Sequence, residues 1–394
     1  MQAMSMSIDM AFFRQISTSQ KSRIMTQSQS NFLKILIVNL IALLYLNHFS
    51  ASAASHDPVV MSFATVGDSR GDPDSAIHKQ DKLWLQNTKA LSRIMREIQA
   101  KKPQALFFNG DMIMGYSSDK PTLNRQYAYW RGMAANLMET GTYVFPVPGN
   151  HEVQEKIIDA NGKTKKVANS ISEDSWRENM GDLIVDAARW KDLTGKQITA
   201  FDLENAPAIA GPDNILTAQT QLSYSFDVAD NHFVVINTDP VGNDGHAPTH
   251  WLAEDLQKAK ERGAKNYFVF GHKPAFTYQY KADIGTDGFD KYPENRDAFW
   301  RTIEQYKATY FCGHQHVFNS MQPTVANGGK AWQIMVGTGG SPFSVAKTDT
   351  NNPQDRMYAW AIVNLHASGK IHLEVFGFDE HYGKTIRLKS FYLK

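Results

Sequence analysis

Short apolar runs alternate with amphipathic stretches through the first part of the chain. Residues 59–66, 105–108 and 143–147 are apolar runs that predict buried strands. Between them, residues 82–99 and 125–138 carry apolar side chains at helical spacing. Each predicted strand ends in polar residues. This order predicts an α/β fold whose functional site lies at the carboxyl ends of the strands.

The same alternation returns in the second part of the chain. Further strands are predicted at residues 222–228, 232–238, 267–270, 308–312, 332–336, 358–363 and 371–378. Helices are expected at 249–262, with Thr249 as a candidate N-cap, and at 297–305. The polar stretch 153–221 separates the two parts. We interpret it as an insertion or lid that covers the site, because so long a loop is uncommon inside a compact domain.

The N-terminal region has a different pattern. The apolar run 35–46 follows Lys34 and precedes the small residues 50–55. This order is typical of a secretory signal peptide, and the run is shorter than the roughly 20 residues that a membrane span requires. We predict a signal peptide over residues 1–53, cleaved near Ala53, followed by one domain over residues 54–394. The alternative is an uncleaved anchor.

Composition excludes several classes of protein. The 394 residues include 41 Lys and Arg and 40 Asp and Glu, a formal net charge of +1. This balance gives no general attraction to nucleic acid, so we expect no nucleic-acid partner. Once the signal peptide is removed, we also expect no stable membrane span. The single cysteine, Cys312, excludes an intramolecular disulfide framework. Export without cysteine pairs favours a bacterial periplasmic or secreted location.

Polar side chains suited to metal binding follow five of the predicted strands. They are Asp68, Asp111, Asn150 with His151, His272, and His314 with His316. Carboxylates, imidazoles and a carboxamide suit divalent Mn, Fe or Zn. Any one of them alone is more often structural. Their recurrence at successive strand ends indicates one shared site.

These motifs resemble, in order, those of the calcineurin-like metallophosphoesterases, a superfamily that includes the purple acid phosphatases. The motifs are Gly67-Asp68, Gly110-Asp111, Gly149-Asn150-His151-Glu152, Gly271-His272 and Gly313-His314-Gln315-His316. The resemblance implies a four-layer α/β/β/α sandwich of two mixed sheets flanked by helices. It also implies two divalent metal ions at the carboxyl ends of the strands.

The resemblance further implies a role for each site residue. Asp111 would bridge the two ions, with Asp68 and His316 on the first ion and Asn150, His272 and His314 on the second. His151 would be catalytic and would stabilise developing charge or protonate the leaving group. We therefore expect an exported enzyme that hydrolyses small phosphomonoesters with a metal-activated hydroxide.

The first motif departs from the family pattern. Arg70 stands where the family usually has a histidine, and a guanidinium stays protonated and cannot bind a metal. Tyr116 lies two residues beyond the position of the tyrosine of purple acid phosphatases, which is Met114 here, so a tyrosinate-bound iron is disfavoured. We hypothesise that Arg70 is catalytic and binds the substrate phosphate. The alternative is a structural arginine paired with an acid such as Asp72.

Two other functions remain open from the sequence. One is a phosphodiesterase acting on nucleotides or phospholipid head groups, and the other is a non-catalytic metal-binding relative that lost its chemistry through Arg70. The Gly-rich stretch that begins at Gly337 is expected to form a turn at the edge of the site. Cys312 is expected to be a buried, inert thiol. His246 and His250 are surface histidines by default, with substrate contact as the alternative.

Overall fold

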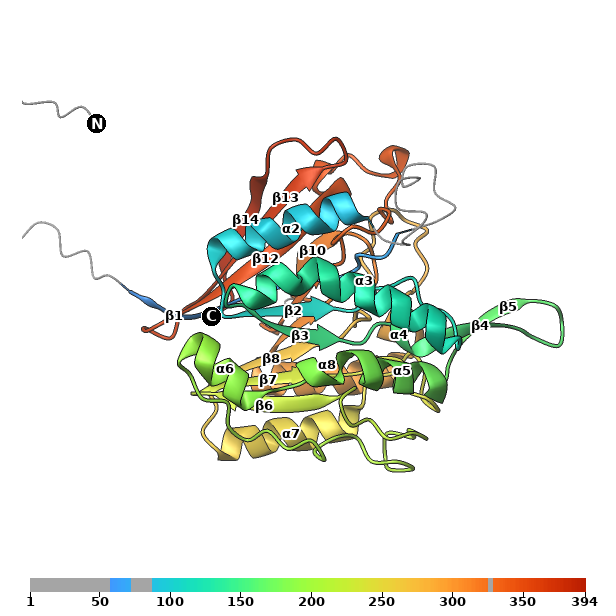
Figure 1. Cartoon of the computed structure of the whole chain (residues 1–394), viewed down its shortest axis with the longest axis horizontal. Coiled ribbons are helices and arrows are strands. Elements are labelled where there is room, and N and C mark those ends of the chain that lie inside the picture. The colour runs from blue at the N-terminus through green and yellow to red at the C-terminus, as the bar shows by residue number, and fades with distance from the viewer. Residues whose placement is uncertain (1–56, 72–86, 325–328) are drawn as a thin grey trace, which may run out of the picture. The chain divides into compact units, whose positions relative to one another are not determined.

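Two six-stranded β-sheets form the centre of the protein (Figure 1). We analysed a computed structural model, which describes residues 57–71, 87–324 and 329–394. Residues 58–394 form one structural unit, and the fold below belongs to it. The predicted signal peptide, residues 1–53, lies outside the described residues.

The first sheet contains the strands that lead to Asp68 and Asp111. Its order is β14 (Ile386–Tyr392), β13 (Ile371–Asp379), β12 (Met357–His366), β1 (Val59–Val66), β2 (Ala105–Asn109) and β3 (Tyr143–Val147). Strands β1, β2 and β3 are parallel, whereas β12, β13 and β14 add to β1 in antiparallel pairs. The three parallel strands therefore end at one edge of the sheet.

The second sheet contains the strands that lead to His272 and His314. Its order is β10 (Phe318–Met321), β11 (Trp332–Val336), β9 (Thr309–Cys312), β8 (Asn266–Phe270), β7 (Asn231–Val235) and β6 (Tyr224–Val228). The four inner strands are parallel, and the two edge strands, β10 and β6, are antiparallel to their neighbours. Both sheets are thus mixed.

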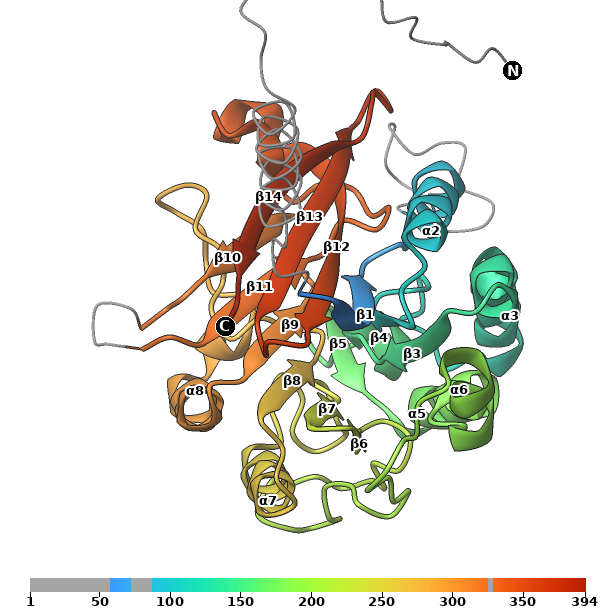
Figure 2. The same cartoon turned by 90° about the vertical axis from the view of Figure 1, so that its left-hand side faces the viewer.

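The two sheets pack face to face through an aromatic core. Phe107 of β2 stacks on Phe270 of β8 with ring centroids 3.8 Å apart, and the Phe63 ring meets Phe268 edge-on at 5.1 Å. Helices α2 (Thr88–Lys101) and α3 (Lys120–Glu139) cover the outer face of the first sheet, and α7 (Thr249–Glu261) and α8 (Pro293–Tyr306) cover that of the second (Figure 2). This confirms the predicted four-layer α/β/β/α fold.

The stretch from 153 to 221 contains both core and surface elements. After the short helix α4 (Asn150–Val153), the hairpin β4 (Gln154–Ile158) and β5 (Thr164–Ala168) projects away from the sheets (Figure 1). Helices α5 (Ser170–Met180) and α6 (Ala187–Thr194) follow, separated by the 3-10 turn η3 (Gly181–Leu183). Trp176 and Trp190 on these helices are fully buried, so α5 and α6 belong to the packed layers.

Short 3-10 turns complete the structure. They are η4 (Phe289–Lys291), η6 (Lys347–Asp349) and η7 (Pro353–Arg356). Within the described ranges, no helix combines the length and the apolar character needed to cross a bilayer.

Candidate metal centre

The loops that follow β1, β2 and β9 hold their site residues in an unusual backbone conformation. Asp68, Asp111 and His314 have φ angles of 62°, 52° and 72°, a region that residues other than glycine rarely adopt. Backbone hydrogen bonds join the loops, including 2.9 Å from the Asp68 amide to the Gly110 carbonyl. Such strain persists where surrounding structure imposes it, and it commonly marks functional sites.

Glycines next to these residues allow the close approach. A Cβ atom on Gly313 would lie 2.2 Å from Oδ2 of Asp68, and one on Gly149 would lie 2.4 Å from the Asp111 amide nitrogen. Both distances are shorter than real Cβ contacts. The glycines of the motifs therefore let separate strand ends meet.

Four side chains from different strand ends converge in one cluster around Asp111. Nε2 of His272 lies 3.1 Å from Oδ1 of Asp111 and 3.1 Å from Nδ1 of His314. Oδ1 of Asn150 lies 2.9 Å from the same His314 nitrogen. Nδ1 of His272 donates a hydrogen bond to the Asn109 carbonyl at 2.8 Å, which turns Nε2 toward the cluster.

A second cluster shares Asp111 with the first. The ligand atoms of Asp68, Asp111 and His316 all lie within 4.8 Å of one another, as do those of Asp111, His272 and His314. Nε2 of His316 is 3.5 Å from Oδ1 of Asp68, and its Nδ1 donates to the Pro342 carbonyl at 2.5 Å. The six predicted ligands are thus brought together in two adjoining groups.

The chemistry of these donors fits a pair of cations. Asp68 and Asp111 are 0% and 1% exposed, and two buried carboxylates this close require compensating positive charge. Burial and the positive charge of Arg70 lower the pKa of His316 to about 3. Burial lowers the pKa of His314 to about 4. Both imidazoles are therefore neutral at neutral pH, which is the ligating form.

Arg70 points into the first cluster. Its Nε lies 3.4 Å from Oδ2 of Asp111, and its Nη2 lies 3.4 Å from Nε2 of His316. The guanidinium thus contacts two of the proposed ligands. Asp72, the alternative partner suggested by the sequence, lies outside the described residues.

His151 is buried beside the shared carboxylate. Its Nδ1 donates a hydrogen bond to the Met114 carbonyl at 2.5 Å, which leaves Nε2 facing Oδ2 of Asp111 at 3.6 Å. The ring packs on Tyr116 with centroids 3.8 Å apart. Burial and the positive charge of Arg70 lower the pKa of His151 well below its usual value. The imidazole is therefore fixed in orientation at the edge of both clusters.

Glu152 supports the site, and no role was predicted for it from the sequence. Its carboxylate accepts hydrogen bonds of 2.8–3.1 Å from four backbone amides, those of Asp111, Met112, Ile113 and Gly149. Burial, together with the charge of Asp111, raises the pKa of Glu152 to about 7. A sequence signal exists, because a Glu three residues after the helix N-cap, here Gly149, is placed to accept a hydrogen bond from the N-cap amide.

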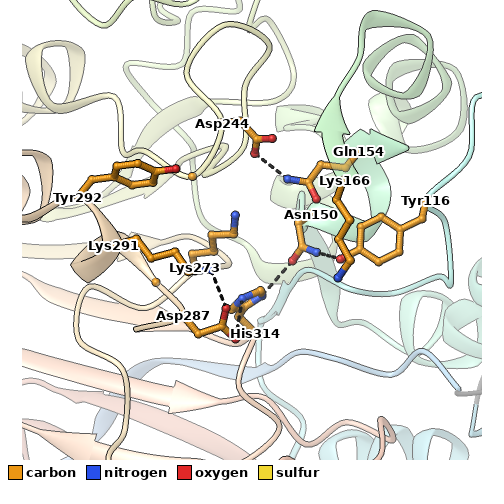
Figure 3. A pocket seen from close by; sticks show the side chains of 12 residues that line it. Tyr116, Asn150, Gln154, Lys166, Asp244, Lys273, Asp287, Lys291, Tyr292 and His314 are labelled. Atoms are coloured by element: carbon orange, nitrogen blue, oxygen red, sulfur yellow. Dashed lines mark hydrogen bonds and ion pairs between the residues drawn. The ribbon is translucent and has the colours of Figure 1, made fainter. Parts of the chain in front are cut away.

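A cavity of about 250 Å³ opens beside Asn150 and His314 (Figure 3). Lys166 and Gln154 from the β4–β5 hairpin line one side of it, together with Tyr116, which hydrogen-bonds the Asn150 amide through its hydroxyl. Other lining residues are Asp244, Lys273, Asp287, Lys291 and Tyr292. The hairpin within the 153–221 stretch therefore contributes to the wall of the site.

The remaining sequence candidates lie outside the two clusters. His246 and His250 line a neighbouring hollow of about 710 Å³, where the His246 ring stacks on Tyr292 at 3.9 Å. The Cys312 thiol is fully buried, as expected. In the Gly-rich turn, the Gly339 and Ser341 amides donate to carbonyls of the β1 loop at 2.7 and 2.9 Å. The turn thus supports the edge of the site.

Comparison with known protein families identifies the class. Residues 61–318, about two thirds of the chain, match the Metallophos model, described as calcineurin-like phosphoesterase. The chain belongs to this family, as its motifs predicted. A search of curated proteins found no match.

A search of solved structures found matches at low sequence identity. A purple acid phosphatase, PPD1, from yellow lupin (Lupinus luteus) seeds is 13% identical with a TM-score of 0.53, over 86% of this chain and 54% of that chain. PhoD is 15% identical (TM-score 0.45, 86% of this chain and 73% of that one), and a dimetal phosphatase from Danio rerio is 12% identical (TM-score 0.40, 84% and 99%). The present chain spans about half the length of the lupin protein.

Proposed function

We propose that the protein is an exported, dinuclear metal-dependent phosphoesterase that hydrolyses phosphomonoesters of small molecules. The observation that carries this proposal is that Asp111 belongs to both clusters of ligand atoms. A carboxylate shared in this way can bridge two cations at the short separation that two-metal hydrolases use. The apolar run 35–46, followed by small residues, supports export to a bacterial periplasm or the medium.

The two clusters support a ligand set for each ion. Asp68, Asp111 and His316 would hold the first ion, and Asp111, Asn150, His272 and His314 the second. Two divalent ions of Mn, Fe or Zn, when bound, would polarise the phosphoryl oxygens and lower the pKa of a water molecule. Burial lowers the pKa of His272, but the charge of Asp111 outweighs burial and raises the pKa to about 10, so metal binding there would release a proton.

The residues around the clusters supply the rest of the chemistry. Arg70 would bind the phosphoryl oxygens, since its fork reaches the boundary of the first cluster. His151 has its Nδ1 committed to the Met114 carbonyl, so Nε2 is the nitrogen able to exchange a proton with the leaving group. The cavity of about 250 Å³ beside Asn150 has room for a small substrate.

Metal analysis combined with a two-substrate assay tests the proposal. We expect two divalent ions per chain and faster hydrolysis of p-nitrophenyl phosphate than of bis-p-nitrophenyl phosphate. Asp111→Asn should reduce kcat/KM by ~10³-fold and lower the metal content, because the shared ligand loses its charge. Chelation should abolish activity, and added metal should restore it. The matched control is Asp192→Asn, an exposed residue of α6.

Two results would contradict the proposal. A faster reaction with the diester would indicate a phosphodiesterase. Two bound metals without hydrolysis of any phosphoester in a broad panel would indicate a non-catalytic metal-binding relative. Localisation is tested separately, by fractionating cells that express the full chain and by sequencing the N-terminus of the exported protein.

A further inference from the structure

Two lysines face the site from the β4–β5 hairpin. Lys156 and Lys166 are directly opposite each other in the antiparallel register, so their side chains share one face of the hairpin. Both ammonium groups lie over the ring of Tyr116, at 5.3 and 4.4 Å from its centroid. Like charges placed directly opposite destabilise a hairpin. The arrangement therefore has a local cost that a bound anion would remove.

Neither lysine has an acidic partner within the described part of the chain. The other lysines of the cavity differ in this respect. Lys273 forms an ion pair with Asp239, and Lys291 pairs with Asp287 at 3.0 Å. Lys165, the neighbour of Lys166 in β5, points to the other face of the hairpin and lies 3.5 Å from Asp159. Lys166 is thus the lining lysine whose charge is available to a ligand.

The position of Lys166 indicates which part of a substrate it would meet. Tyr116 contacts both Lys166 and Asn150, because its ring lies under the ammonium and its hydroxyl accepts a hydrogen bond from the Asn150 amide. The Lys166 side chain ends beside this hydrogen bond (Figure 3). The ammonium therefore lies on the wall of the cavity, next to the tyrosine that bonds the proposed ligand Asn150. Arg70 and His151, in contrast, face Asp111 directly. Under the proposed function, the scissile phosphoryl group would lie beside that pair.

We propose that Lys166, supported by Lys156, binds a second anionic group on the leaving-group side of the substrate. The preferred substrates would then be small phosphomonoesters that also carry a carboxylate or a second phosphate. This inference rests on the proposed function, because the phosphoryl group is placed at the two ligand clusters. Lys166 is here a specificity-determining residue, and the bond that breaks is unchanged.

Binding of two matched phosphonates tests the inference without requiring hydrolysis. Methylphosphonate has one anionic group, and phosphonoacetate adds a carboxylate. We expect calorimetry on the metal-loaded protein to show that Lys166→Met reduces the preference for phosphonoacetate by about tenfold, the size of one charge-assisted hydrogen bond. Lys156→Met should reduce it by about twofold to threefold, and Lys165→Met should leave it unchanged. Thermal unfolding checks that each variant is folded.

If Lys166→Met keeps part of the preference for phosphonoacetate over methylphosphonate, that part is due to binding of the carboxylate to the metals. Equal loss of affinity for both phosphonates would overturn the inference, because Lys166 would then contact the phosphoryl group. An unchanged ratio would overturn it as well. The lysine-dependent part should also weaken between 50 and 500 mM salt.

Hydrolysis provides the second readout. The ratio of kcat/KM for 3-phosphoglycerate to that for glycerol 3-phosphate should fall by about tenfold in Lys166→Met and stay constant in Lys165→Met. If the phosphonate preference depends on Lys166 but no phosphoester is hydrolysed, the proposed function fails and the anion site stands. If the esters are hydrolysed with no such preference, the anion site fails and the proposed function stands.

Discussion

The guanidinium of Arg70 lies where two buried carboxylates and an imidazole meet. Its Nε is 3.4 Å from Asp111, and its Nη2 is 3.4 Å from His316. A positive charge at this position would compete with a metal ion if it stayed on the ligand atoms. It would complement the metals if it turned to the anionic substrate instead. Because the Arg70 side chain is long and 18% exposed, its guanidinium has room to turn toward a bound substrate.

Replacing Arg70 with Ala tests this role. We expect kcat/KM for a phosphomonoester to fall by about 10- to 100-fold, since a charge-assisted hydrogen bond contributes about 1.5–3 kcal/mol. Metal content should be unchanged, because the six ligands remain. Arg70→Lys should recover part of the activity, since it keeps the charge and loses the fork. An unchanged kcat/KM in Arg70→Ala would remove the phosphate-binding role.

Helix α7 shows how one element depends on a distant segment. The sequence places a candidate N-cap at Thr249, but the N-cap is Pro248, which makes no side-chain hydrogen bond, so that prediction is wrong. The Asp213 carboxylate caps the helix instead and accepts from the amides of His250 and Trp251 at 2.9 and 3.0 Å. A negative charge also interacts favourably with the helix N-terminus.

Asp213→Ala should therefore destabilise the protein by about 1–2 kcal/mol, the usual effect of losing a helix cap. The measurement is the free energy of unfolding in urea. The control is Asp192→Ala, an exposed residue of α6, which should change stability by less than about 0.5 kcal/mol. Equal stability of the two variants would show that α7 does not rely on this cap.

A buried ionic network links the second sheet to its outer helix. His232 of β7 contacts Asp227 of β6 at 2.6 Å and Asp255 of α7 at 2.8 Å. Arg262 forms an ion pair with Asp227 at 2.7 Å. Burial lowers the pKa of His232, but the hydrogen bonds to Asp227 and Asp255 outweigh it and raise the pKa above its usual value. Despite burial, the same bonds lower the pKa of both carboxyls.

This network makes the stability of the whole protein depend on pH. Because the folded-state pKa of His232 is raised, its contribution is full below about 6.5 and is lost as pH rises through the folded pKa. Because both carboxyl pKa values are lowered, their contribution is full above about 3.8 and is lost as pH falls. The network should contribute most between these two values.

His232→Gln should accordingly destabilise the protein by about 3 kcal/mol at pH 5.5, since it leaves buried carboxylates without their partner. The difference from the unaltered protein should shrink at pH 9. Urea unfolding at the two pH values measures it, with the exposed His381→Gln as the control. A difference that grows with pH would contradict the assigned protonation of His232.

Local signals account for the elements that were predicted well. Strands β1 and β3 have the predicted bounds, because each is a short apolar run between polar residues. Strand β14 and the β4–β5 hairpin were not predicted. Most of their residues are exposed, so they lack the apolar pattern that marks a buried strand. Edge and projecting strands are held by pairing with neighbours, which a local pattern does not record.

The sequence by itself determined the α/β class, the family and the residues brought to the centre, because strand ends and glycine-bounded motifs are local features. Only the tertiary structure showed that Arg70 faces the shared carboxylate, that Glu152 gathers four amides from two loops, and that Lys166 reaches the cavity wall. The contacts to Asp111 join residues about 40 positions apart along the chain. Their geometry follows from how the two sheets and the hairpin pack, and packing is a property of the folded chain as a whole.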